Sequence, residues 1–356
     1  MQKHAWVFVG TETTESSEGI YAARLNQDSG ELGSPMLVAA TDGPTFLATD
    51  PEQQFLFCTG KPPQPGVPFN TVSAYTIDRV HGTLAPINSQ QVPEMACCHI
   101  STSLGGRVLF AVDYSNAKAA TFPVGQDGRI EPPTDLLIYD TATQAVPDRQ
   151  QAPHVHSINP DVSNRYVLVC DFSADAIKTY ELNAGTKVLT FVSATPTATG
   201  AGPRHLTCHP NGKWVYAIHE LNGTVALLDF DNTTGSLETR QTISSLPEGF
   251  AAQNTTAEIA LSPDLRFLYG SNRGHDSLAY YEVDPETGLL SRQGIVSTEG
   301  THPRNFSITP TGHHLLVSNR DSDNVVVFRL DRETGKPEYT GHQLEISRPM
   351  CLQIMR

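Results

Sequence analysis

The amino-acid sequence predicts an all-β fold, a seven-bladed β-propeller whose four-stranded blades form a single domain over residues 1–356. The first observation behind this prediction is a repeat. A pattern of strand, turn, strand, loop, strand and turn at residues 200–237 recurs at 254–289 and at 303–337. The second observation is composition, because 25 prolines and 27 glycines at turn spacing, without a helical pattern of useful length, are typical of an all-β chain.

The third observation is the period of the repeat. The turn after the first strand of each unit is marked by Pro51, Pro160, Pro210, Pro263 and Pro310. These residues are 109, 50, 53 and 47 positions apart, and the first gap holds two units with a turn at 103–105. A unit of that length fits the chain about seven times, and a lone four-stranded sheet must stack on neighbours to bury both faces.

The two ends of the chain are expected to share one blade. The N-terminus supplies strands at 6–10 and 20–25 and a turn at 28–32, so it begins at the second strand of a unit. Residues 348–355 read as the missing first strand. We therefore expect the C-terminal strand to complete the first blade and to close the ring by backbone pairing, which removes exposed sheet edges.

The remaining blades follow in order along the chain. They are expected to open near Pro44, Met95, Pro153, Pro203, Thr256 and Pro303. Turn signals between outer strands occur at 78–82, 284–288 and 331–335. The run rich in proline and glycine at 60–68 is expected to form an elongated loop inside one blade.

Charge and composition argue against several classes of function. A net charge of −14 disfavours nucleic acid or an anionic membrane as the main partner. The first residues lack the pattern of a signal peptide, and no apolar stretch approaches the roughly 20 residues that span a bilayer. Six cysteines without metal-ligand spacing favour buried free thiols and a cytoplasmic location. We expect a monomer or weak homodimer with a small-molecule partner, no metal and no cofactor.

Two sets of repeat positions are expected to converge on one mouth of the central channel. Six residues before each turn stand Thr45, Cys97, His154, Arg204, Ala257 and Arg304. Ten or eleven residues after it stand Lys61, Asp113, Asp171, Glu220, Arg273 and Arg320. Arginine, carboxylate and imidazole side chains gathered at such a mouth would suit a small polar ligand.

Motifs in the second half of the chain resemble a known family. They are GPRH at 202–205, HPNG at 209–212, Glu220-Leu221-Asn222, Ser262-Pro263, SNRG at 271–274 and PRNF at 303–306. Together they are similar to the seven-bladed lactonases, which include bacterial propeller-type 6-phosphogluconolactonases and fungal carboxymuconate lactonizing enzymes. The resemblance covers essentially the whole chain and is densest from about residue 150 onward.

The resemblance implies a metal-independent site of one histidine, two arginines and one glutamate. Matched motif by motif, these fall on His156, Arg204, Glu220 and Arg273. His219 stands where the family usually has asparagine. From the repeat positions we add His154, Asp171, Arg304 and Arg320 as candidate substrate-binding residues.

These residue types fit the hydrolysis of a lactone. The reaction needs a base near neutral pH to activate water and a cation to stabilise the oxyanion at the ring carbonyl. His156 or Glu220 is the expected base, with the other orienting it. Arg204 and Arg273 would polarise the carbonyl or clamp a carboxylate or phosphate, to which the planar guanidinium is suited.

Structural alternatives remain open at the sequence level. Arg204 and Glu220 could form an ion pair that only stabilises their blade, and His156 could be a satisfied core histidine. Asp171 and Asp113 could be turn residues that accept hydrogen bonds from backbone amides. The remaining histidines considered, His99, His205, His209, His302, His313 and His314, are expected to be structural or exposed.

Three functions are compatible with the sequence. The leading one is hydrolysis of a sugar lactone, such as 6-phosphogluconolactone or a related aldonolactone. The second is a lactonizing cycloisomerase acting on a muconate-type diacid, and the third is a non-catalytic propeller that binds a partner on its rim. The charged residues at the predicted mouth rank the third below the others.

Overall fold

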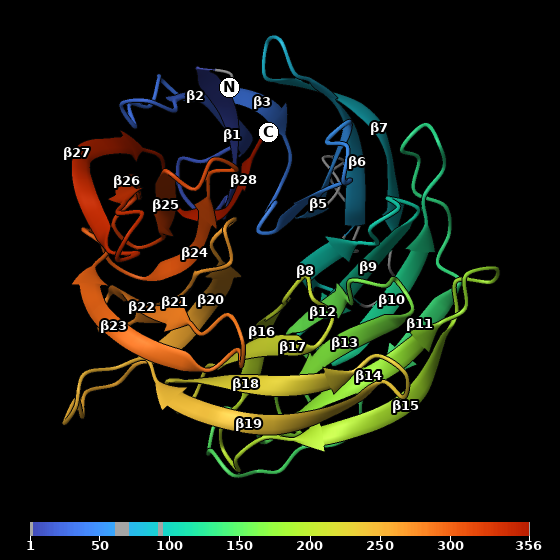
Figure 1. Cartoon of the computed structure of the whole chain (residues 1–356). Helices are drawn as coiled ribbons and strands as arrows, with labels where there is room; N and C mark the ends of the chain where they lie inside the picture. The colour runs from blue at the N-terminus through green and yellow to red at the C-terminus, as the bar shows by residue number, and fades with distance from the viewer. Residues whose placement is uncertain (1–2, 61–70, 92–94, 356) are drawn as a thin grey trace.

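A computed structural model describes residues 3–60, 71–91 and 95–355 of the chain. These residues form 28 strands and no helix, in seven antiparallel sheets of four strands that surround a central axis (Figure 1). The prediction of a seven-bladed propeller with four-stranded blades is confirmed. Lys61 and most of the predicted loop at 60–68 lie outside the described residues.

Each blade runs from an innermost strand at the axis to an outermost strand at the perimeter. In that order, blade 1 contains β28 (Pro349–Ile354), β1 (His4–Thr11), β2 (Gly19–Asn26) and β3 (Met36–Ala40). Blade 2 contains β4 (Leu47–Thr49), β5 (Phe55–Gly60), β6 (Thr71–Asp78) and β7 (Thr83–Gln91). Blade 3 contains β8 (Cys97–Thr102), β9 (Val108–Asp113), β10 (Lys118–Pro123) and β11 (Asp135–Ile138).

The second half of the ring repeats the same order. Blade 4 contains β12 (Ser157–Pro160), β13 (Tyr166–Asp171), β14 (Ala176–Leu182) and β15 (Leu189–Pro196). Blade 5 contains β16 (Pro203–Cys208), β17 (Trp214–His219), β18 (Thr224–Asp231) and β19 (Ser236–Ser244). Blade 6 contains β20 (Thr255–Leu261), β21 (Phe267–Arg273), β22 (Ser277–Val283) and β23 (Leu290–Ser297). Blade 7 contains β24 (Pro303–Ile308), β25 (His314–Asn319), β26 (Asn324–Leu330) and β27 (Pro337–Glu345).

The ring closes through the C-terminal strand. β28 pairs antiparallel with β1, with Val7 opposite Ile354 and Val9 opposite Leu352. Both chain ends therefore lie in blade 1 (Figure 1). An ion pair of 2.6 Å between Arg348 Nη2 and Glu12 Oε2 joins the same two segments beyond the strands. The predicted closure is confirmed.

The apolar core is distributed between the blades. Side chains that alternate along one strand pack against opposite neighbours: in β13, Tyr166 and Leu168 pack against blade 5, while Val167 and Val169 pack against blade 3. Because both faces of such a strand are buried, its sequence reads as a continuous apolar run.

The neighbouring blade leaves no space for a side chain at two turn glycines of the repeat. Gly335, between β26 and β27, has a positive φ of 68°, and a Cβ there would overlap the ring of Phe267 in blade 6. A Cβ at Gly288 would likewise overlap the ring of Trp214 in blade 5. A side chain at either position would meet both an unfavourable backbone conformation and an aromatic ring.

Candidate active site

A β-bulge in the innermost strand places consecutive side chains on the same side of a blade. In β16, Pro203 is opposite His219 and His205 is opposite Ile218, so Arg204 is the extra residue. Arg204 Nη1 consequently lies 3.2 Å from His205 Nε2, although neighbouring residues of a regular strand point to opposite faces. β24 repeats the bulge, with Arg304 as its extra residue.

Glu220 is the centre of the charged cluster. It follows β17 directly, and Arg273 ends β21, so both lie at the rim where the innermost strands begin. Glu220 Oε2 is 3.0 Å from Arg204 Nε and 2.8 Å from Arg273 Nη2, and Glu220 Oε1 accepts a hydrogen bond from Arg149. The carboxylate is only 4 % exposed.

These arginines determine the protonation state of Glu220. Burial alone would raise the pKa of the carboxyl, but the guanidinium groups of Arg273, Arg204 and Arg149 outweigh it and bring the pKa to about 2. Glu220 is therefore an anion at neutral pH and a very weak base.

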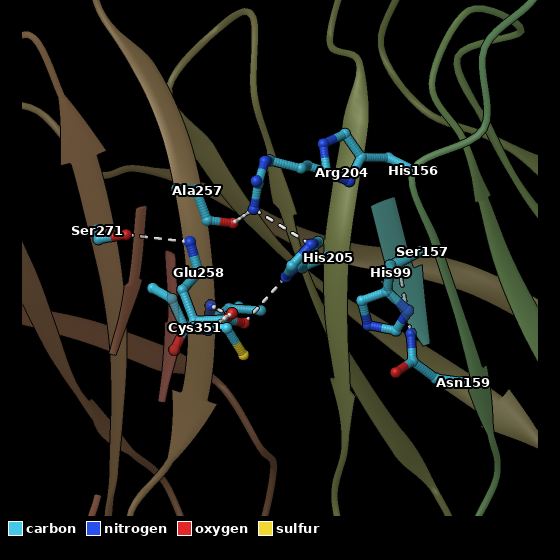
Figure 2. A network of polar contacts seen from close by, with 12 residues as sticks. His99, His156, Ser157, Asn159, Arg204, His205, Ala257, Glu258, Ser271 and Cys351 are labelled. Carbon is cyan, nitrogen blue, oxygen red and sulfur yellow. Dashed lines mark hydrogen bonds and ion pairs between the residues drawn. The ribbon is translucent and has the colours of Figure 1, made fainter. Parts of the chain in front are cut away.

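The two buried arginines are also held by backbone carbonyls. Arg204 Nη1 donates a hydrogen bond of 2.7 Å to Ala257 O (Figure 2). Arg273 Nη2 donates one of 2.7 Å to Thr256 O. Burial, with the charges of Arg273 and Arg304, lowers the pKa of Arg204 to about 9, which still leaves the group charged at neutral pH. Both guanidinium groups are fixed in place before any ligand arrives.

His156 lies beside this cluster, just before β12. Its Nε2 is 3.9 Å from Glu220 Oε2, which is too long for a hydrogen bond. Burial, followed by the charge of Arg204, keeps the pKa of the imidazole well below its usual value, so the ring is neutral. Its Nδ1 is buried and has no hydrogen-bond partner among the described residues.

Arg304 differs from the other arginines of the mouth. It is partly buried at the second position of β24, and its side chain forms neither a hydrogen bond nor an ion pair with any described residue. Burial and the nearby Arg273 lower its pKa to about 10, so it remains charged. Its guanidinium group is available to an anionic ligand.

Three predicted site residues have partners other than Glu220. His154 stacks on Tyr114 at 4.1 Å and its Nδ1 lies 2.7 Å from Tyr114 O. Asp171 is fully buried, forms an ion pair of 2.8 Å with Lys178 Nζ and accepts the amide of Ala174, as expected of a turn residue. Arg320 forms an ion pair with its neighbour Asp321, 2.6 Å between Nε and Oδ1.

The structure thus brings together His156, Arg204, Glu220 and Arg273 from three successive blades, with Arg304 nearby. The ion pair between Arg204 and Glu220, which the sequence allowed as a structural contact, forms within this larger cluster. His99 and His205, expected to be structural or exposed, are both buried.

Sequence reasoning missed Arg149. It lies in the connection 139–156 between blades 3 and 4, which is longer than the connections at 197–202, 245–254 and 298–302, so alignment on turn residues gave position 149 no equivalent in the other blades. This connection is anchored by Gln150, whose Nε2 donates to Phe172 O and to Asp175 Oδ1. Arg149 thereby reaches Glu220 from outside the ring of strands.

The described residues contain no group of three His, Cys, Asp or Glu side chains that could hold a metal ion. Within the same residues there is also no helix of the length and apolarity needed to cross a membrane.

Comparisons with known proteins agree on one family. Residues 6–354 match the family model described as "Lactonase, 7-bladed beta-propeller". The chain is 33% identical over 348 residues to a 6-phosphogluconolactonase of Bacillus subtilis, covering 98% of this chain and 97% of that one. A 6-phosphogluconolactonase of Formosa agariphila is 31% identical over 354 residues, with 98% and 99% covered.

Solved structures give the same result. The periplasmic gluconolactonase PpgL of Pseudomonas aeruginosa superposes with a TM-score of 0.92 at 31% identity, and the match covers 99% of each chain. The likeness therefore extends over the whole ring and includes the blades that carry the Glu220 cluster.

Proposed function

The chain belongs to the seven-bladed β-propeller lactonase family, and we propose that this lactonase hydrolyses an anionic aldonolactone, such as 6-phosphogluconolactone, at the Glu220 cluster. One observation carries the preference for an anion. Three guanidinium groups, of Arg149, Arg204 and Arg273, contact the single carboxylate of Glu220, and that of Arg304 lies nearby, in a chain whose net charge is −14. This local excess of positive charge would attract and hold a negatively charged substrate.

The same residues can supply the chemistry of ring opening. A water oxygen attacks the lactone carbonyl, the ester C–O bond breaks, and the proton lost by the water passes to the ring oxygen that leaves. Negative charge develops on the carbonyl oxygen in the transition state, where preorganised donors are most effective. Arg204 and Arg273 are the donors that fit this role, since backbone carbonyls already hold them.

His156 is the better candidate for the base. The pKa of Glu220 is about 2, so this carboxylate would accept a proton from water only weakly. His156 is neutral and therefore able to accept a proton. An anionic substrate would offset the arginine charges that lower the pKa of His156 and would make the ring a stronger base. Glu220 then serves to align Arg204 and Arg273.

Arg304 is the proposed anchor for the phosphate or carboxylate of the substrate. It is the mouth arginine without a partner among the described residues, so it can bind an anion without breaking an ion pair. The similar proteins include 6-phosphogluconolactonases and a gluconolactonase, which favours hydrolysis over muconate cyclisation. An assay on both kinds of lactone distinguishes the two reactions.

The test is a lactone panel followed by a pH indicator, with 6-phosphogluconolactone, the unphosphorylated gluconolactone and a muconolactone. We expect Arg204→Ala to lower kcat about 10²- to 10³-fold, the usual effect of removing one oxyanion donor. Arg304→Gln should raise KM about tenfold for the phosphorylated lactone alone, in keeping with the loss of one charged hydrogen bond. Arg165→Ala is the matched control, because this exposed arginine pairs with Glu181 away from the mouth.

Full activity of Arg204→Ala on every lactone that the native enzyme hydrolyses would refute the assignment of the site. An equal effect of Arg304→Gln on phosphorylated and unphosphorylated lactones would refute its role as the anion anchor. Turnover of the muconolactone alone would favour the cycloisomerase function instead.

A further inference from the structure

We propose that Glu258 and His205 are positioning residues that fix the orientation of Arg204, and that the series of hydrogen bonds to which they belong starts at the strand that closes the ring. The proposal rests on the proposed function, in which Arg204 stabilises the oxyanion. Neither Glu258 nor His205 forms a hydrogen bond or ion pair with the Glu220 carboxylate, so their influence on the reaction would be indirect.

The series of hydrogen bonds runs from blade 5 through blades 6 and 7 to blade 1. Arg204 Nη1 is 3.2 Å from His205 Nε2, and His205 Nδ1 is 3.0 Å from Glu258 Oε1 (Figure 2). Asn305 Nδ2 donates a hydrogen bond of 2.5 Å to Glu258 Oε2. Asn305 Oδ1 in turn accepts a hydrogen bond of 2.9 Å from the backbone N–H of Leu352 in β28.

The direction of every bond in the series is determined by the backbone. The N–H of Leu352 can only donate, so the Asn305 oxygen faces β28 and its amide nitrogen must donate to Glu258. Glu258 Oε1 also accepts the N–H of Ile259 at 3.0 Å, so both carboxylate oxygens act as acceptors. With Glu258 ionised, His205 carries its proton on Nδ1, which leaves the Nε2 lone pair to accept from Arg204.

Burial makes this order difficult to rearrange. Arg204 is 2 % exposed, His205 3 % and Asn305 6 %. Burial, with the charges of Arg204 and Arg304, keeps the pKa of His205 well below its usual value, so the ring stays neutral and has one acceptor nitrogen. A buried polar network in which every member is paired fixes its members more firmly than isolated bonds would.

The consequence for Arg204 concerns its orientation. Nη1 is held by two acceptors, His205 Nε2 and Ala257 O, and Nε faces Glu220 Oε2 at 3.0 Å, so the plane of the group is fixed on two sides. Loss of His205 as an acceptor would leave Nη1 with Ala257 O alone and would allow the plane to rotate. A transition-state donor that is free to rotate loses much of its effect.

Glu258→Gln tests the proposal without changing the size of the side chain. If the new amide oxygen faces His205, its NH₂ faces the NH₂ of Asn305. If it is reversed, its NH₂ faces both the N–H of Ile259 and Nδ1 of His205. One donor therefore opposes another in either orientation. We expect kcat to fall about 10- to 100-fold with KM nearly unchanged, as when an outer partner that orients a reacting group is lost.

The matched control is Asp161→Asn, another buried carboxylate changed to its amide. Asp161 accepts the N–H of Tyr166 and the hydroxyl of Ser163 in a turn at the other end of blade 4. This variant should keep the native kcat even where it lowers the melting temperature. A similar loss of kcat in both variants would mean that general destabilisation, and not positioning, explains the effect of Glu258→Gln.

A double-mutant cycle separates this proposal from the proposed function. If Glu258 acts through Arg204, Glu258→Gln will not lower kcat further once Arg204→Ala is present. If Glu258→Gln lowers kcat by the same factor in both backgrounds, or leaves the native kcat within about twofold, the positioning role is refuted while the role of Arg204 stands. Full activity of the Arg204→Ala variant would instead refute the proposed function, on which this proposal rests.

A spectroscopic measurement does not depend on activity. The ¹⁵N shifts of the His205 ring, assigned by comparison with His205→Asn, should show the neutral tautomer protonated at Nδ1 in the native protein at pH 7. The tautomer protonated at Nε2, or a cationic ring, would overturn the proposal, because either form would place an N–H against Arg204.

Discussion

Replacing Glu220 by glutamine should make the stability of the protein respond differently to acid. The carboxylate contacts Arg204, Arg273 and Arg149, which bring its pKa from an ordinary value of 4.5 to about 2. A difference of that size between the folded and unfolded states corresponds to about 3 kcal/mol of stability at neutral pH. Glutamine has the same shape as the protonated acid but cannot carry the charge.

The sign follows from which state binds the proton first. Because the folded carboxyl has the lower pKa, the unfolded chain takes up the proton as the pH falls below 4.5. The contribution of Glu220 is therefore complete above pH 4.5 and is lost as the pH falls toward 2. The stability difference between the native protein and Glu220→Gln should shrink by about 1.4 kcal/mol for each pH unit in that window.

Urea unfolding at pH 6, 4.5 and 3.5 measures this difference, with the fluorescence of Trp6 and Trp214 as the signal, since both residues pack between blades. Glu258→Gln is the matched control. Burial raises the pKa of Glu258, so its contribution is present below pH 4.5 and is lost as the pH rises through the folded value. A Glu220→Gln difference that stays constant from pH 6 to 3.5 would refute the electrostatic account of the cluster.

Two further predictions concern the fold. Deletion of residues 350–356 removes β28, so we expect the truncated chain to lose its cooperative thermal unfolding transition, and an unchanged melting temperature would contradict the closure. Gly335→Ala should destabilise the protein by more than Gly341→Ala in urea unfolding. Both glycines have positive φ, which costs an alanine about 1–2 kcal/mol, but only at Gly335 would the Cβ meet a ring, that of Phe267. Equal destabilisation would show that the contact between blades is unimportant there.

Repeat positions and motifs were enough to predict the four residues of the charged cluster. His156, Arg204, Glu220 and Arg273 stand near the start of an innermost strand or at the end of the next one, and antiparallel pairing brings those ends to one rim. The same alignment placed Asp171 and Arg320 at positions equivalent to Glu220, because the sequence does not show which side chains pair with each other. Lys178 neutralises Asp171, and Asp321 pairs with Arg320.

The seven blades, the closure of the ring and the rim at which charged residues meet could be predicted from the residues, because strand alternation and turn residues repeat with a fixed period. Which side chains touch depends on the folded arrangement. It brought Arg149 to Glu220 from a connection outside the repeat, and it left Arg304 without a partner among the described residues. It also turned Arg204 and His205 to the same side through a bulge that the alternation of residue types does not reveal. Protonation states depend on those distances and on burial, so the choice between His156 and Glu220 as the proposed base required the fold.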